Sequence, residues 1–114
     1  MKVIDGDTFQ VHVPAMPNGL QIFSIRLRGI DAPELGKSAK CPEEQILALR
    51  AKEVTERFLK DHKFYLKNPR PDKYGNRILA DIEGDGLSLA GFLLSLSLAH
   101  LYNGHGPRPN WCEF

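Results

Sequence analysis

The sequence predicts a mainly β domain with helices, an α+β fold in which a five-stranded OB barrel carries one long helix and a shorter second helix. Short alternating runs of apolar and polar residues, bounded by glycine and proline, indicate strands. One longer run carries apolar residues at helical spacing. The elements follow one another as hairpin, third strand, helix and two more strands, which is the order of an OB barrel. An open α+β sandwich remains a possible alternative.

The N-terminal part of the chain predicts a β-meander. Residues 2–4 and 8–13 are predicted strands, joined by the acidic turn Asp5-Gly6-Asp7, where Gly6 permits a positive φ. Asn18-Gly19 predicts the next turn, and residues 20–29 predict a second long strand.

A long helix is predicted over residues 42–60. Pro42 and the two glutamates after it suit a first helical turn, where a missing N–H is tolerated and the helix dipole favours acids. Apolar side chains recur with helical spacing and predict a stripe packed on the sheet, consisting of Leu47, Ala51, Val54 and Phe58.

Two further strands and a second helix are predicted after the long helix. The strands cover residues 63–67 and 78–82, with a surface loop over residues 68–76 between them. Ser88 is the predicted N-cap of the second helix, and Ser97 follows it at a position that often takes the left-handed conformation. The expected inward side chains are Leu89, Phe92, Leu93 and Leu96. Residues 104–114 form a tail rich in glycine and proline.

Length and composition predict one domain over residues 1–114 and narrow the classes of function. The chain has 114 residues, with Lys+Arg 15 against Asp+Glu 14 and a formal net charge of +1. A protein that only binds DNA would be more basic, so any basic surface must be local.

No apolar run approaches the roughly 18 residues of a membrane span. We expect a monomer without membrane contact. The N-terminus enters strand-like sequence directly, without a signal-peptide pattern, which suggests a trimmed chain and leaves the compartment open.

The chain contains two cysteines, Cys41 and Cys112. Their spacing matches no zinc-ligand pattern, which would need further Cys or His nearby. They are either unrelated thiols or a disulfide that ties the C-terminal segment to the loop before the first helix. We predict the disulfide, and with it a secreted or periplasmic location.

Residues 26–34, Arg-Leu-Arg-Gly-Ile-Asp-Ala-Pro-Glu, combine the charges of a catalytic site. Strand alternation places Arg26 and Arg28 on one face. Gly29 lets the backbone bend and Pro33 restricts it, so that Asp31 and Glu34 leave the strand end in a defined geometry. A site that holds a hard cation and a phosphodiester needs both kinds of charge close together.

The acidic groups predict a site for a hard cation. The expected ligands are the carboxylates of Asp5, Asp7 and Asp31 and the carbonyl of Ala32, with Glu34 bound directly or through water. Such an oxygen-only set suits Ca²⁺ or Mg²⁺ rather than zinc or copper.

The basic and aromatic groups predict contacts with a phosphodiester. Arg26 and Arg77 could each donate two parallel N–H···O bonds to the transition state, while Glu34 deprotonates a water. The remaining expected substrate contacts are Arg28, Lys73, Tyr74 and Tyr102, of which Tyr102 could stack on a nucleotide. The simpler alternatives are surface salt bridges for the arginines and rim packing for Tyr74 and Tyr102.

Four ordered motifs resemble the staphylococcal nuclease (thermonuclease) family: residues 4–8, 26–34, 72–80 and 98–102. The resemblance covers nearly the whole chain. It implies an OB-fold and a Ca²⁺-dependent phosphodiesterase that acts on DNA and RNA and leaves 3′-phosphate ends. By motif match, Asp7 and Asp31 resemble the calcium carboxylates and Ala32 the backbone ligand. Arg26, Glu34 and Arg77 resemble the catalytic trio, and Lys73 and Tyr74 resemble substrate-phosphate contacts.

Some positions depart from the family pattern. Asn76 stands between Gly75 and Arg77, where the family usually places the arginine directly after the glycine, and Ala32 stands where the thermonuclease type has threonine. The family's final helix has no counterpart in the sequence, and the first strand is short. A catalytically weak module that binds nucleic acid or a protein partner is therefore the alternative function.

Overall fold

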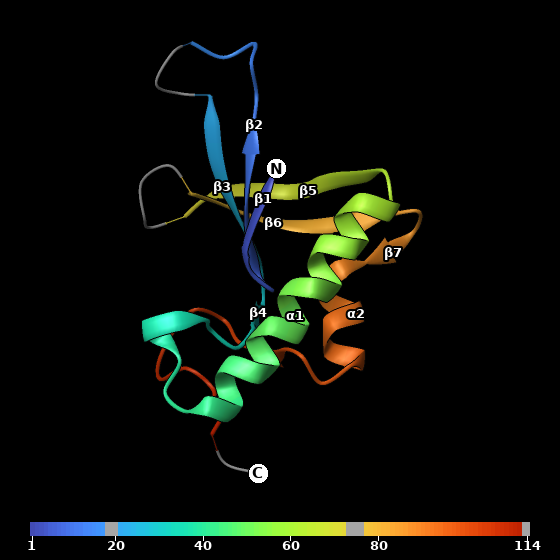
Figure 1. Cartoon of the computed structure of the whole chain (residues 1–114). Helices are drawn as coiled ribbons and strands as arrows, with labels where there is room; N and C mark the ends of the chain where they lie inside the picture. The colour runs from blue at the N-terminus through green and yellow to red at the C-terminus, as the bar shows by residue number, and fades with distance from the viewer. Residues whose placement is uncertain (18–20, 73–76, 113–114) are drawn as a thin grey trace.

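A curled sheet forms the frame of the protein in the computed structural model, which describes residues 1–17, 21–72 and 77–112 (Figure 1). The strand order is β1-β2-β3-β6-β5. These strands are Lys2–Asp5 (β1), Thr8–His12 (β2), Ile22–Leu27 (β3), Arg77–Gly84 (β6) and Phe64–Pro71 (β5). The β3–β6 pair is parallel and the other neighbours are antiparallel. This half-barrel with two helices confirms the predicted α+β, OB-like fold.

Two helices cover the sheet. Helix α1 (Pro42–Asp61) packs against β1, and α2 (Leu89–Ser95) packs against β6 and α1. Ser88 caps α2 as predicted, because its Oγ accepts a hydrogen bond from the Gly91 N–H at 3.1 Å. The short strand β7 (Leu87–Ser88) pairs with β6 just before this helix. No helix of the described residues is long and apolar enough to cross a membrane.

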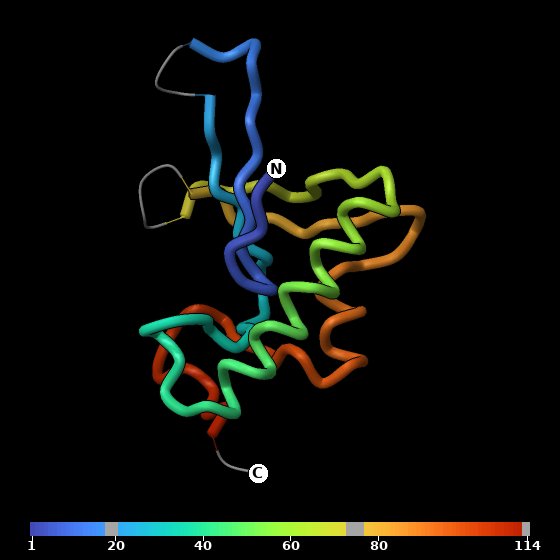
Figure 2. The backbone as a smooth tube through the Cα atoms, in the orientation of Figure 1, coloured from blue at the N-terminus to red at the C-terminus, as the bar shows by residue number. Residues whose placement is uncertain are grey.

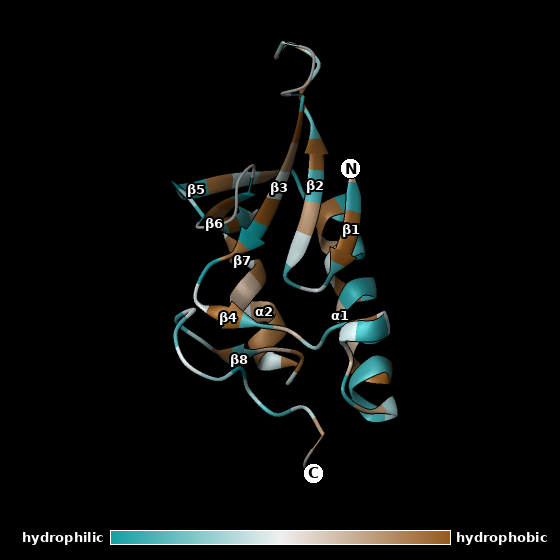
Figure 3. Cartoon of the chain, turned by 90° about the vertical axis from the view of Figure 1, so that its left-hand side faces the viewer, coloured by the Kyte–Doolittle hydropathy of each residue, from teal (hydrophilic) through white to brown (hydrophobic). Residues whose placement is uncertain are grey.

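The core lies between the sheet and the two helices. Of the predicted stripe on α1, Ala51 and Phe58 are buried, while Leu47 and Val54 pack at the edge of the core. Their partners are buried sheet and α2 side chains, including Phe9, Ile25, Leu27, Ala80, Ile82, Leu89 and Leu93. In Figure 3 the strands carry much of the hydrophobic colour and α1 much of the hydrophilic colour, which agrees with one buried face on this helix.

Gly6 is required by close packing and not by a positive φ, so that prediction was wrong. A Cβ at this position would lie 2.6 Å from the Cβ of Ala51 on α1. The hydroxyl of the buried Thr55, also on α1, donates to the Gly6 carbonyl at 2.6 Å. The helix therefore fixes the turn that carries Asp5 and Asp7.

The structure corrects other local predictions. Residues 68–71 continue β5 past an irregularity between Lys67 and Arg70 and are not a loop. Phe92 and Leu96 are 43% and 47% exposed and are not part of the buried core, because the short helix α2 buries only Leu89 and Leu93; the Phe92 ring still packs 6.3 Å from that of Phe58. Ser97 does adopt the left-handed conformation, with φ 59°. The predicted turn at Asn18-Gly19 lies outside the described residues.

A second, two-stranded sheet brings the C-terminal segment back to the middle of the chain. Strand β4 (Ile30–Asp31) pairs with β8 (His100–Leu101), and both are visible side by side in Figure 3. Beyond β8, the chain runs beside the loop that contains the 3₁₀ helix η1 (Gly36–Ser38), as Figure 2 shows. Cys41 and Cys112 form a disulfide across a sequence separation of 71 residues. The predicted disulfide is therefore confirmed.

Candidate active site

The site forms where the turn between β1 and β2 meets the end of β3. Arg26 pairs with Thr8 across the β2–β3 ladder, and the Leu27 N–H donates to the carbonyl of Asp7 at 2.8 Å. Gly29 then takes a φ of 84°, which turns the chain into β4 and places Asp31 next to Asp7. The predicted bend at Gly29 is thus present.

Arg26 lies between two buried carboxylates. Its Nη2 is 3.6 Å from Oδ2 of Asp7 and 3.5 Å from Oδ1 of Asp31. The Ala32 N–H and the Thr8 hydroxyl also donate to Asp7, each at 2.9 Å. Burial raises the pKa of the Asp7 carboxyl, and the charge of Arg26 offsets only part of that rise.

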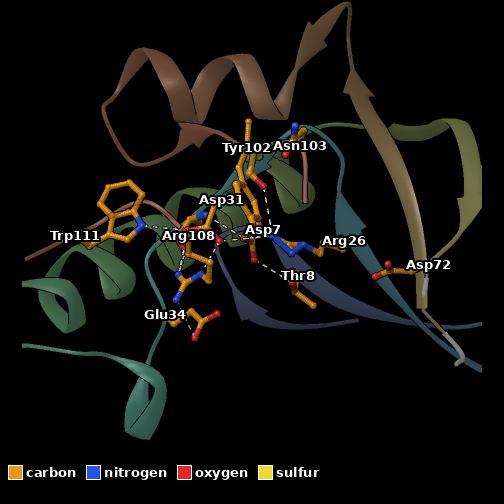
Figure 4. A network of polar contacts seen from close by, with 12 residues as sticks. Asp7, Thr8, Arg26, Asp31, Glu34, Asp72, Tyr102, Asn103, Arg108 and Trp111 are labelled. Carbon is orange, nitrogen blue, oxygen red and sulfur yellow. Dashed lines mark hydrogen bonds and ion pairs between the residues drawn. The ribbon is translucent and has the colours of Figure 1, made fainter. Parts of the chain in front are cut away.

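A second arginine, Arg108 from the C-terminal tail, lies beside the same carboxylates (Figure 4). We call the carboxylates of Asp7, Asp31 and Glu34 the acidic group. Its Nε and Nη2 donate to the two oxygens of Asp31 at 3.1 and 3.0 Å, which is a bidentate ion pair. Nη2 also lies 3.4 Å from the Ala32 carbonyl, and Nη1 lies 3.5 Å from Oε2 of Glu34. The sequence analysis did not identify Arg108, because the tail has no periodic pattern and Asp31 is 77 residues away.

The tail that carries Arg108 is fixed by two contacts that follow this residue in the chain. The indole N–H of Trp111 donates to Oδ2 of Asp31 at 3.2 Å, and the Trp111 ring lies on His100 with centroids 4.2 Å apart. The next residue, Cys112, forms the disulfide with Cys41. Arg108 is therefore held in place by more than its own ion pairs.

Glu34 stands at the open side of the acidic group, with its side chain 32% exposed. Its backbone N–H donates to Oε2 of Glu44 at 2.9 Å, and the Lys40 N–H donates to Oε1 of the same carboxylate at 2.9 Å. Burial raises the pKa of Glu34, and neighbouring carboxylates add to that rise against the charge of Arg108. Burial likewise raises the pKa of Asp5, whose Oδ1 accepts from the Leu35 N–H at 3.2 Å.

Arg77 shares a cleft with Arg26 and Glu34. It opens β6 and pairs with Ser24 of the parallel strand β3, so Arg77 and Arg26 lie on the same face of the sheet two residues apart in register. Arg77 donates through Nε to Asp72, whose side chain is only 6% exposed. The cleft has a volume of about 480 Å³ and is lined by residues from all these segments, including Arg26, Glu34, Asp72, Arg77 and Arg108. The structure thus brings the predicted trio into one cavity.

The other predicted substrate contacts differ in position. Arg28 and Tyr102 line the cleft. Arg28 forms an ion pair with Asp81 at 2.8 Å, and the Tyr102 hydroxyl donates to the Gly106 carbonyl at 2.8 Å. Lys73, Tyr74 and the inserted Asn76 lie outside the described residues.

Comparison with protein families now adds to this geometry. The model of the family described as "Staphylococcal nuclease homologue" matches residues 24–110, well over half of the chain. The chain belongs to this family. No curated protein sequence matches it significantly. The stretch matched by the staphylococcal nuclease homologue family contains Arg26, Asp31, Glu34, Arg77 and Arg108. A nuclease-type or nucleic-acid-binding module is therefore supported.

Staphylococcal nuclease homologues generally use a calcium ion, and some of the predicted donors for such an ion lie close together. Asp7 and Asp31 flank Arg26, the Ala32 carbonyl shares Arg108 with Asp31, and all three are hard oxygen donors. However, Arg108 engages both oxygens of Asp31 and the Ala32 carbonyl. Within the described residues, no group of three or more Asp, Glu, His or Cys side chains could hold a metal ion. In this arrangement a calcium ion could use the oxygens of Asp31 and Ala32 only if it displaced Arg108.

Proposed function

We propose that the chain is a nuclease that hydrolyses the phosphodiester bonds of DNA and RNA, depends on Ca²⁺ and leaves 3′-phosphate ends. The observation that supports this most is the cleft in which the partly exposed carboxylate of Glu34 lies together with the guanidiniums of Arg26 and Arg77. A phosphoryl group in the transition state gains charge on its equatorial oxygens, and arginines at fixed positions stabilise that charge.

The two arginines would bind the phosphate from adjacent strands. Arg26 and Arg77 point from β3 and β6 into the same cleft, and each is positioned by a buried carboxylate, Asp31 and Asp72 respectively. Because such an ion pair limits the rotamers of an arginine, less entropy is lost when the phosphate binds.

Glu34 would act as the general base. Its carboxylate is partly exposed at the mouth of the acidic group, where a water can reach it, and its backbone is fixed by Glu44. It would take a proton from the water that attacks phosphorus. The bond between phosphorus and the 5′-oxygen would break, the 5′-oxygen would take up a proton from solvent and leave as a 5′-hydroxyl, and the phosphate would stay on the 3′-oxygen.

The calcium requirement is supported by the donor types and by family membership. A bound Ca²⁺ would supply electrophilic polarisation of the phosphate. Arg108 engages the carboxylate of Asp31 and the carbonyl of Ala32 and would have to be displaced before Ca²⁺ could bind to them.

The test is hydrolysis of single-stranded DNA and of RNA by the wild type and by Glu34→Gln, with Ca²⁺, with Mg²⁺ and with a chelator. We expect cleavage by the wild type in Ca²⁺ and very little in Mg²⁺, which demands tighter octahedral geometry. Analysis of the product ends should give 3′-phosphates. Equal rates of hydrolysis in Ca²⁺ and in Mg²⁺ would contradict the calcium requirement. Equal rates for the wild type and Glu34→Gln would show that Glu34 is not the general base.

A second candidate function is a module that binds nucleic acid without cleaving it. The specific observation in its favour is Arg108, whose guanidinium partly neutralises the acidic group. This function predicts that the protein retards single-stranded DNA in a gel while the DNA stays intact in every metal.

The disulfide supports an oxidising compartment, and a secreted or periplasmic location is part of the proposal.

A further inference from the structure

We propose that Arg108 competes with Ca²⁺ for the oxygens of Asp31 and Ala32, and that the Cys41–Cys112 disulfide strengthens this competition because it holds the tail in place. This inference deepens the proposed function, since it concerns the same donors, but it can be tested without any nucleic acid.

Arg108 contacts several of the oxygens that were predicted as metal ligands, namely those of Asp31, Ala32 and Glu34. Its guanidinium reaches both Asp31 oxygens and the Ala32 carbonyl within 3.4 Å, and Oε2 of Glu34 and of Glu44 lie 3.5 and 3.6 Å away. A planar guanidinium with several donors can satisfy many oxygen acceptors at once, and it never loses its charge in proteins. An ion and Arg108 cannot bind the same oxygens together.

The surroundings of Arg108 favour a built-in contact over a chance surface pairing. The Asp31 side chain is 2% exposed, so the ion pair is shielded from water and from salt. Trp111 donates to the same carboxylate, and Cys112 closes the disulfide only four positions after Arg108. The tether keeps the effective concentration of the guanidinium at the site high, so that even an ion of good intrinsic affinity must compete with it.

Two kinds of variant separate competition from simple charge. Arg108→Gln removes the competing guanidinium, whereas Cys41→Ser/Cys112→Ser keeps the arginine and removes only the tether. Serine at position 41 can still accept the hydrogen bond that the Cys41 sulfur receives from the Glu44 N–H. Arg28→Gln is the matched control, since Arg28 lines the same cleft but pairs with Asp81.

The measurement is Ca²⁺ affinity by calorimetry, with folding of each protein checked by circular dichroism. We expect Arg108→Gln to bind Ca²⁺ roughly tenfold or more tightly than the wild type, as is typical of coupled sites. The double cysteine variant should also bind more tightly, and combining it with Arg108→Gln should add no further gain. Arg28→Gln should match the wild type.

Three results would overturn the inference. Equal affinity of the wild type and Arg108→Gln would show that Arg108 and Ca²⁺ do not compete. An equal gain in Arg28→Gln would show that only the charge of the cleft matters, and no gain in the double cysteine variant would rule out the tether. Should Arg108→Gln fail to fold, Arg108→Lys serves instead, because lysine keeps the charge but cannot form the bidentate pair, and it should give a smaller gain. A protein that binds Ca²⁺ as expected but cleaves no DNA would refute the proposed function and leave this inference intact.

Discussion

Replacing Glu44 by glutamine tests how the site loop is held. The Glu44 side chain is 2% exposed, and its two oxygens accept the N–H groups of Glu34 and Lys40 at 2.9 Å each. In Glu44→Gln the amide NH₂ must face one of these N–H donors. A hydrogen bond to a charged group contributes about 1.5 to 3 kcal/mol, so we expect a loss of about 2 to 3 kcal/mol in the free energy of unfolding at neutral pH.

The same variant makes a prediction about pH. Burial raises the pKa of Glu44, but the hydrogen bonds from Glu34 and Lys40 and the charge of Arg108 outweigh burial and leave this pKa below its ordinary value of 4.5. The folded state then binds fewer protons than the unfolded chain near that value. The stabilisation is therefore complete above pH 4.5 and is lost as the pH falls through the lower pKa of the folded state. The cost of Glu44→Gln should shrink in the same range.

The assay is urea denaturation with the disulfide intact, at neutral pH and at about pH 3, below the ordinary carboxyl range. Glu43→Gln is the matched control, because Glu43 lies in the same turn of α1 but is exposed, and it should change stability by less than about 0.5 kcal/mol. A Glu44→Gln cost as small as that of the control, or one that does not depend on pH, would refute the view that the charged carboxylate fixes the loop. A stable Glu44→Gln protein with a normal kcat would also show that Glu34 needs no such support.

Three further predictions concern the trio, the disulfide and Asp7. In steady-state assays, kcat should fall by on the order of 10² or more in each of the variants Glu34→Gln, Arg26→Lys and Arg77→Lys. Glutamine cannot accept the proton, and lysine cannot form the two parallel hydrogen bonds of an arginine. An active Arg77→Lys would mean that the insertion of Asn76 has moved Arg77 away from the reacting phosphate. Removing the disulfide should lower the free energy of unfolding by about 4 kcal/mol, the loop-closure entropy of a 71-residue separation, and a loss near zero in chemical denaturation would contradict that account. In the presence of chelator, the Tm of Asp7→Asn should be no lower than that of the wild type. The variant should lose most of any rise in Tm that Ca²⁺ causes in the wild type. A full rise in the variant would show that the metal does not bind at Asp7.

Local sequence was sufficient to predict the parts of the site that lie on one strand or turn. Arg26, Asp31 and Glu34 are fixed by strand alternation, one glycine with a positive φ and one proline, and all of these are short-range effects. Arg77 was predicted directly before the strand of residues 78–82; in the structure it is the first residue of β6, and the parallel β3–β6 register brings it beside Arg26.

Long-range contacts account for what the sequence analysis missed. Glu44 was assigned to the first turn of the helix for its charge, but its partners are backbone groups of the preceding loop. Arg108 lies in a tail without periodicity and meets Asp31 only after the chain has passed through the whole domain. The cysteine pair was the one available signal, because a disulfide between Cys41 and Cys112 forces the tail back to the loop that follows Glu34.

The distribution of exposure within the site would allow a chain with a formal net charge of only +1 to attract a polyanion. The carboxylates of Asp7 and Asp31 are 7% and 2% exposed, whereas Arg26 is 18%, Arg108 25% and Arg77 27% exposed. A phosphodiester that enters the cleft therefore meets guanidiniums before it meets buried acids. The two buried acids, Asp7 and Asp31, lie beneath the arginines and hold them in place. The site is therefore preorganised to bind an anion and does not repel it. Removing a buried carboxylate should consequently weaken phosphate binding, although it makes the protein more positive.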